Sequence, residues 1–250
     1  MSTARSVAPV MRNVWWLLAS ILAWEAVQAL SGLGPETTGP YPINPYQLLL
    51  LFVMPGLTAF AFVRLFLACV QSSYGSLNTY TLTSSPFAWV FWLGLAVAMV
   101  GQGEHAATAA LHAALPPVVA HGDYAATVTF FERQLGHWLL GLGFFSMTAV
   151  VLLLGPGSPQ RAYGADRLLL GLGSVATFGF AIIYFGVEGR QIVPAVLGSG
   201  ALAAMGLWAV PGGERTHDPV GLLVLPGTLI AGLGLLVWGL IVGGQPTWPF

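Results

Sequence analysis

Seven long runs of apolar residues, almost free of charged side chains, dominate this sequence. A membrane-spanning helix needs about 20 mostly apolar residues in succession, and each run is close to that length. Because apolar and polar residues do not alternate within the runs, they indicate helices and argue against a membrane barrel. The expected spans cover residues 14–33, 46–70, 87–115, 125–154, 167–189, 191–210 and 220–242. We therefore predict an all-α fold, a polytopic bundle of about seven transmembrane helices that forms one domain over residues 1–250.

The composition places this bundle in a lipid bilayer. Hydrophobic residues make up 56% of the chain and charged residues 7%, whereas soluble domains carry roughly 25% charged residues. The net charge is −1 and lysine is absent, so the chain lacks the basic surface of a nucleic-acid-binding protein. Without lysine it also cannot form a retinal Schiff base. We expect a multi-pass protein of the cell membrane whose main partner is the bilayer.

The arginines predict the orientation of the bundle. If all seven runs span, six arginines lie at one face of the membrane and two at the other. Positively charged residues concentrate on the cytoplasmic side, so we expect a cytoplasmic N-terminus and an extracytoplasmic C-terminus. The larger group is Arg5, Arg12, Arg64, Arg161, Arg167 and Arg215, and the smaller is Arg133 and Arg190.

Ionisable side chains within the spans are costly unless they are paired or solvated, so they mark candidate functional sites. In the predicted topology they gather in the outer half of the bundle. The third and fourth spans are joined by a short loop and run antiparallel. Counting the helical rise from that loop places His105 level with His137, and His112 level with Glu132. The remaining acids of the group are Glu25 in the first span and Glu188 at the outer end of the fifth.

Helix geometry limits what this group can do. His105 and His112 are about 10.5 Å apart along one helix, too far to hold a single ion, so a shared metal would need ligands from different helices. On an ideal helix, Glu132 and His137 point about 140° apart and share a pocket only if it is broad or the helix is irregular there.

Imidazole and carboxylate groups together suit zinc, iron or copper. A zinc-bound water would hydrolyse a small or lipid-like substrate, which suggests a metal-dependent membrane enzyme acting on an apolar molecule. The candidate metal ligands are His105, His112 and His137, and the candidate catalytic acids are Glu25, Glu132 and Glu188.

Three alternatives remain open. The histidines and acids are also suited to a proton relay in a proton-coupled carrier or channel. Haem bound between His105 and His137 is a second possibility, since facing histidines hold haem in membrane cytochromes. The third is a structural membrane subunit whose polar layer assembles the bundle.

Gly101 and Gly103, followed by His112 and then by Glu132 on the next helix, resemble a pattern of the seven-span superfamily that includes alkaline ceramidases and adiponectin receptors. That family also carries a His-x-x-x-His pair on its last span. Residues 220–242 contain no histidine, so we do not assign the chain to this family.

Overall fold

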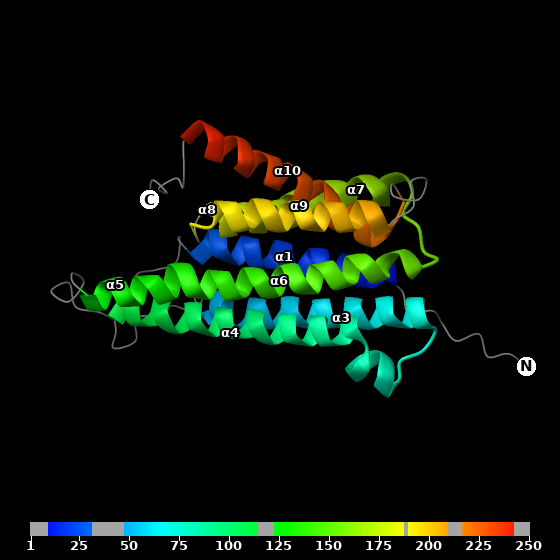
Figure 1. Ribbon diagram of the computed structural model, residues 1–250, viewed down its shortest axis with the longest axis horizontal. Helices are drawn as coiled ribbons and strands as arrows, with labels where there is room; N and C mark the ends of the chain where they lie inside the picture. Colours follow the sequence, from blue (N-terminus) through cyan, green and yellow to red (C-terminus); the bar gives the residue numbers. More distant parts are fainter. Residues whose placement is uncertain (1–9, 32–47, 115–122, 188–189, 210–216, 243–250) are drawn as a thin grey trace, which may run out of the picture.

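The computed structural model describes residues 10–31, 48–114, 123–187, 190–209 and 217–242, and the regular structure in these segments is helical (Figure 1). The α-helices are α1 (Val10–Ser31), α3 (Met54–Tyr74), α4 (Pro86–Ala114), α5 (Asp123–Phe130), α6 (Gly136–Leu154), α7 (Gly164–Ser174), α8 (Phe180–Val187), α9 (Ile192–Ala209) and α10 (Pro219–Val242). Four π-helical turns accompany them in the described segments: η1 (Leu49–Val53), η2 (Tyr80–Ser84), η3 (Phe131–Leu135) and η5 (Val175–Gly179). One 3₁₀ turn, η4 (Gly155–Gly157), follows α6.

The chain is a multi-pass membrane protein. Within the described segments, six helical stretches are long and apolar enough to cross a bilayer; they contain α3, α4, α6, α7 with α8, α9, and α10. Large apolar side chains on these helices are exposed; Trp208, for example, is 82% exposed and Ile241 79%. Surfaces of this kind require lipid around them. Seven spans were predicted; the first predicted run lies in α1, which is helical but is not among these six stretches.

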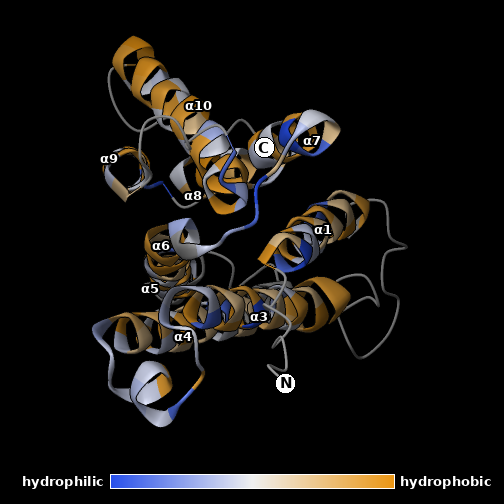
Figure 2. Cartoon of the chain, turned by 90° about the vertical axis from the view of Figure 1, so that its right-hand side faces the viewer, coloured by the Kyte–Doolittle hydropathy of each residue, from blue (hydrophilic) through white to orange (hydrophobic). Residues whose placement is uncertain are grey.

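The helix α6 occupies the middle of the bundle. Viewed end-on, it lies between α3 and α4 on one side and α8, α9 and α10 on the other, with α1 beside α3 (Figure 2). The contact between α4 and α6 is the most extensive of any pair of described elements. A site formed between α4 and α6 is therefore held at the centre of the fold.

Local polar groups set several helix ends. Gly75 ends α3 in the left-handed conformation, with φ of 70°, which glycine adopts without strain. The hydroxyl of Ser85 accepts a hydrogen bond from Ala88 N at the start of α4. Asp218 Oδ2 accepts one of 2.6 Å from Gly221 N and so caps α10. These caps satisfy amide groups that the first turn of a helix leaves without partners.

Candidate functional site

His105 of α4 and His137 of α6 are in direct contact. Their ring centroids are 4.8 Å apart and their planes meet at 73°, an edge-to-face arrangement. His137 is 3% exposed, and its ring also lies 5.7 Å from that of Tyr184 on α8. The predicted meeting of His105 with His137 is thus confirmed.

Small residues bring these two histidines together. A Cβ atom on Gly101 would overlap the backbone of Leu140, and one on Gly143 would overlap the backbone of Gly94. Only glycine therefore permits the observed approach of α4 to α6. Because α4 and α6 are antiparallel, later residues of α4 meet earlier residues of α6: Gly94 lies against Gly143, Gly101 against Leu140, and His105 against His137.

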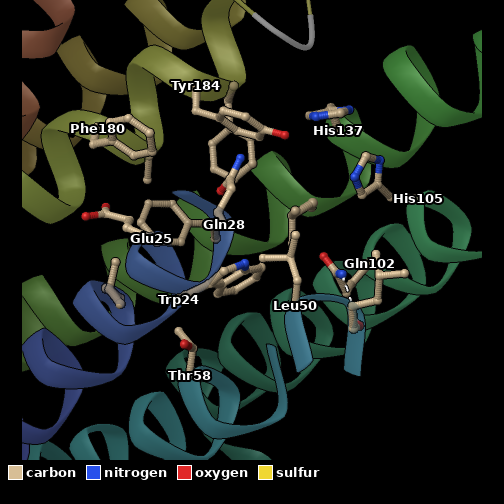
Figure 3. Close-up of a pocket in the computed structure, with 16 residues that line it drawn as sticks. Trp24, Glu25, Gln28, Leu50, Thr58, Gln102, His105, His137, Phe180 and Tyr184 are labelled. Carbon is tan, nitrogen blue, oxygen red and sulfur yellow. Dashed lines mark hydrogen bonds between the residues drawn. The ribbon is translucent and has the colours of Figure 1, made fainter. Parts of the chain in front are cut away.

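A cavity of about 110 Å³ opens beside the histidine pair (Figure 3). Its walls come from α1, η1, α3, α4, α6 and α8, elements that are far apart in the sequence. Most of the lining is apolar, including Trp24, Phe144 and Phe180. Phe180 is 44% exposed.

Polar side chains line more than one side of the cavity. Figure 3 shows His105 and His137 at one side, with Gln102 next to them, Glu25 and Thr58 at the other, and Gln28 between. These side chains come from α1, α3, α4 and α6. A molecule in the cavity would meet polar groups from several helices within a mostly apolar lining.

Two polar atoms at the Glu25 end are buried without a hydrogen-bond partner among the described residues: Thr58 Oγ1 and Glu25 Oε1. Thr58 as a whole is only 6% exposed. Some helical hydroxyls, such as those of Thr108 and Thr177, bond to the carbonyl oxygen four residues earlier, whereas that of Thr228, outside the cavity, also lacks a partner among the described residues. An unpaired buried polar group costs about 1–3 kcal/mol. Because neither Thr58 Oγ1 nor Glu25 Oε1 is accessible from the cavity, a molecule in the cavity does not reach these two atoms.

Three of the π-helical turns border the cavity. Leu50 and Leu51 of η1 line it, η3 ends just before His137, and η5 ends just before Phe180. Each π turn inserts an extra residue into the helix and often occurs at functional sites. The amide of Gln102 donates a hydrogen bond of 3.2 Å to the Leu51 carbonyl oxygen, which ties η1 to α4.

The turn η3 also changes the geometry expected between positions 132 and 137. In a π turn, residues five apart are linked by a backbone hydrogen bond and approach the same face of the helix. The helix is therefore irregular between Glu132 and His137, which is the condition under which these two side chains could share a pocket. The side chain of Glu132 itself lies outside the described part of the structure.

The structure brings together three of the predicted site residues: Glu25, His105 and His137 all line the cavity. The structure describes the helical backbone at His112 and Glu132 but not their side chains. Glu188 lies outside the described residues. Their predicted roles stay predictions.

Sequence reasoning missed Gln28, Thr58, Gln102 and Tyr184, which also line the cavity. Two of them carried a usable signal. Gln102 precedes His105 by three residues and Gln28 follows Glu25 by three, spacings that place each pair on one helix face. Nothing comparable marks Thr58 or Tyr184.

The described side chains can be tested against the predicted metal site and the predicted haem site. Among the described side chains, no group of three or more His, Cys, Asp or Glu residues could hold a metal ion. His112, Glu132 and Glu188, which the metal hypothesis requires, are outside that set. The direct contact of the His105 and His137 rings leaves no space for a porphyrin between them, which argues against the haem hypothesis.

Comparison of the chain with protein-family models, with curated proteins and with solved structures finds no match. The function is therefore argued from the geometry of the site.

Proposed function

We propose that this protein binds a small, largely apolar molecule of the bilayer in the cavity between α1, α4, α6 and α8, and that the histidine pair exchanges a proton with the polar group of that molecule. The main support is the cavity itself, an apolar space of about 110 Å³ with two touching imidazoles in its wall. Ligand sites are typically apolar pockets in which a few polar groups fix orientation. A membrane enzyme acting on an apolar substrate is the functional class that this arrangement favours.

The chemistry of the pair supports the proton-exchange part of the proposal. A neutral imidazole carries one N–H donor and one acceptor nitrogen, and its ordinary pKa lies near neutrality. Two imidazoles in contact can therefore offer a ligand either a donor or an acceptor. Glu25, in the same cavity, provides a second proton-exchanging group, which fits its predicted role as a catalytic acid.

Filling the cavity is expected to abolish binding without unfolding the protein. Ala181 of α8 lines the cavity, and Ala181→Phe would place a ring in it. The ring would occupy the space that a ligand needs, so labelling of the cavity residues should be lost. The measurement is labelling of protein in nanodiscs by a phenol that carries a diazirine, with the labelled residues located by mass spectrometry.

The matched control is Leu197→Phe on α9, where the native side chain is 68% exposed and is not part of the cavity lining. It should leave labelling of the cavity residues unchanged. Equal labelling of wild type and Ala181→Phe, with both melting at the same temperature, would contradict the proposal.

A proton relay is the second candidate function. Polar side chains from α1, α4, α6 and α8 line the cavity, and a cavity of about 110 Å³ is large enough to hold water. Such waters would link Glu25 with the histidine pair. Proteoliposomes in which wild-type protein dissipates a pH gradient and His137→Phe does not would favour the relay over the binding site.

The topology that frames both functions is seven spans in the cell membrane with the N-terminus inside. We expect alkaline phosphatase fused to the C-terminus to be active in a bacterial host, because this enzyme matures only in the oxidising space outside the cytoplasm. The same reporter inserted after Arg161, in the connection between α6 and α7, should be inactive. An N-terminal tag accessible from outside would show that α1 does not cross, and would leave six spans.

A further inference from the structure

We propose that α3 carries a docking surface for a transmembrane helix of another protein, and that Arg64 pairs with an aspartate or glutamate which that helix holds near the middle of the membrane. The surface consists of Val53, Leu57, Phe60 and Arg64, and we call it the Arg64 face. None of these residues lines the cavity, so the inference goes beyond the proposed function and does not depend on it.

Arg64 lies near the middle of its membrane span. The apolar stretch that contains it runs from Leu49 to Tyr74, so Arg64 is ten residues, about 15 Å, from the nearer end. A second helix gives the same depth. Two residues before Arg64, Phe62 packs against Phe144 with ring centroids 5.8 Å apart, and Phe144 is at the middle of the stretch Gly136–Leu154. A charged side chain at this depth is costly unless it is paired or hydrated.

The described part of the chain supplies no counter-charge for this arginine. Its guanidinium carbon lies 5.8 Å from the centre of the Phe60 ring. The ring attracts the positive charge but gives the five guanidinium N–H donors no oxygen to bond. Among the described residues, Arg64 has neither an ion pair nor a hydrogen bond. A carboxylate would complete the site, because its two oxygens match the planar guanidinium with two parallel hydrogen bonds.

The direction of the side chain favours a partner in the middle of the membrane over a lipid phosphate. An arginine that binds lipid head groups extends towards the nearer membrane surface, which here means towards Tyr74. The guanidinium lies instead over Phe60, one helical turn further from that end. It is therefore directed towards the centre of the span.

The surface around Arg64 is apolar and open. The helix α3 lies at the edge of the bundle, on the side opposite α10 (Figure 2). Val53, Leu57 and Phe60 are all exposed, and with Arg64 they follow the i, i+4, i+7, i+11 spacing that lines one face of a helix. This is also the spacing of side chains that meet a second helix packed alongside. Such a helix would cover the apolar side chains and place its own residues against Arg64.

A second copy of this chain does not supply the carboxylate. Glu25 lines the cavity inside the bundle, and Asp166 is the third residue of α7. Glu104 is ten residues, about 15 Å, along α4 from Gly94, which packs against the middle of α6. A two-fold dimer through the Arg64 face would also bring two like charges together. The partner is therefore a different chain.

The test presents the full-length protein with a synthetic transmembrane helix. The probe is a leucine–alanine peptide with about 20 apolar residues, a glutamate at its centre, a diazirine on a neighbouring leucine and biotin at one end. Protein and peptide are combined in phosphatidylcholine vesicles and illuminated, and the adducts are quantified through biotin and located by mass spectrometry. The glutamate peptide should form about tenfold more adduct than the same peptide with glutamine, equivalent to roughly 1.4 kcal/mol, with the adducts on α3.

Arg64→Met removes the charge and keeps a long unbranched side chain. It should reduce the adduct of the glutamate peptide to the level of the glutamine peptide. Its melting temperature should not fall, because Arg64 makes no hydrogen bond within the described bundle. Arg167→Met, which removes an exposed arginine of α7, is the matched control and should keep the full preference for glutamate. Moving the glutamate seven residues towards one end of the peptide, about 10.5 Å, should remove the preference.

Three results would overturn the assignment. The first is equal adduct of the glutamate and glutamine peptides with wild type, and the second is an undiminished preference for glutamate in Arg64→Met. The third is loss of the preference when phosphatidylglycerol is added, with native mass spectra that show this lipid bound to wild type but not to Arg64→Met; Arg64 would then hold a lipid phosphate. Labelling of the cavity should be the same in Arg64→Met and wild type, so any of these results leaves the proposed function standing.

Discussion

Gly143→Ala is expected to lower the apparent melting temperature by roughly 6–12 °C, a loss of about 3 kcal/mol at ~2–4 °C per kcal/mol. The added Cβ would overlap the carbonyl oxygen of Gly94 and the amide nitrogen of Ala98 on α4. These are backbone atoms, so no side chain can rotate away, and the helices must separate. Since this seam positions His105 against His137, labelling of the cavity should fall together with stability.

Gly141→Ala is the control on the same helix. A Cβ at Gly141 meets no atom within 4 Å, and alanine in a helix interior is more favourable than glycine by about 0.5–1 kcal/mol. This variant should therefore melt at the wild-type temperature or slightly above it. Equal melting temperatures for the two variants would mean that α4 and α6 are not as close as described.

The second large effect is expected at Gly227 of α10. A Cβ there would overlap the carbonyl oxygen of Ser174, just before the turn η5, and lie 2.7 Å from the amide nitrogen of Gly179, the last residue of that turn. Gly227 N also donates a hydrogen bond of 2.8 Å to Ser174 Oγ. Gly227→Ala should cost about 4 kcal/mol, above the usual range for overpacking, because both clashes are with backbone atoms and the hydrogen bond is strained as well.

The measurement for Gly227→Ala is the yield of monodisperse protein after detergent extraction, followed by thermal unfolding of what is recovered. Gly234→Ala, on the same helix with no atom within 4 Å of the added Cβ, should behave as wild type. Ser174→Ala removes the hydroxyl alone and should cost only about 1 kcal/mol. A Gly227→Ala variant as stable as Ser174→Ala would show that the steric part of this account is wrong.

The helices were predictable because span length and hydropathy are local properties of the chain. The run predicted over 191–210 forms α9 (Ile192–Ala209), and the run over 220–242 forms α10 (Pro219–Val242). The meeting of His105 with His137 was also predictable, since a constant rise per residue and a short connecting loop fix relative depth. The sequence predicted a span in α1 as well, but α1 is not among the six candidate spans of the described segments.

The cavity was not predictable from the sequence. It forms where π turns widen their helices, and the sequences of η1 and η5, Leu-Leu-Leu-Phe-Val and Val-Ala-Thr-Phe-Gly, read as ordinary apolar helix. The unpaired hydroxyl of Thr58 also could not be predicted, because some helical threonines bond to a carbonyl of their own helix, such as Thr177, and others do not, such as Thr228. Whether a side chain lacks a partner depends on the packing of several helices at once.

The place of the cavity among helices with apolar, exposed outer side chains has a consequence for how affinity is expressed. A bilayer molecule that binds there arrives from the leaflet and not from water, so the protein responds to the mole fraction of ligand in the lipid. Doubling the amount of lipid at fixed protein and fixed total ligand would halve that mole fraction and would double the apparent Kd per litre of suspension. Affinities for this cavity are comparable between preparations only when they are normalised to the lipid phase.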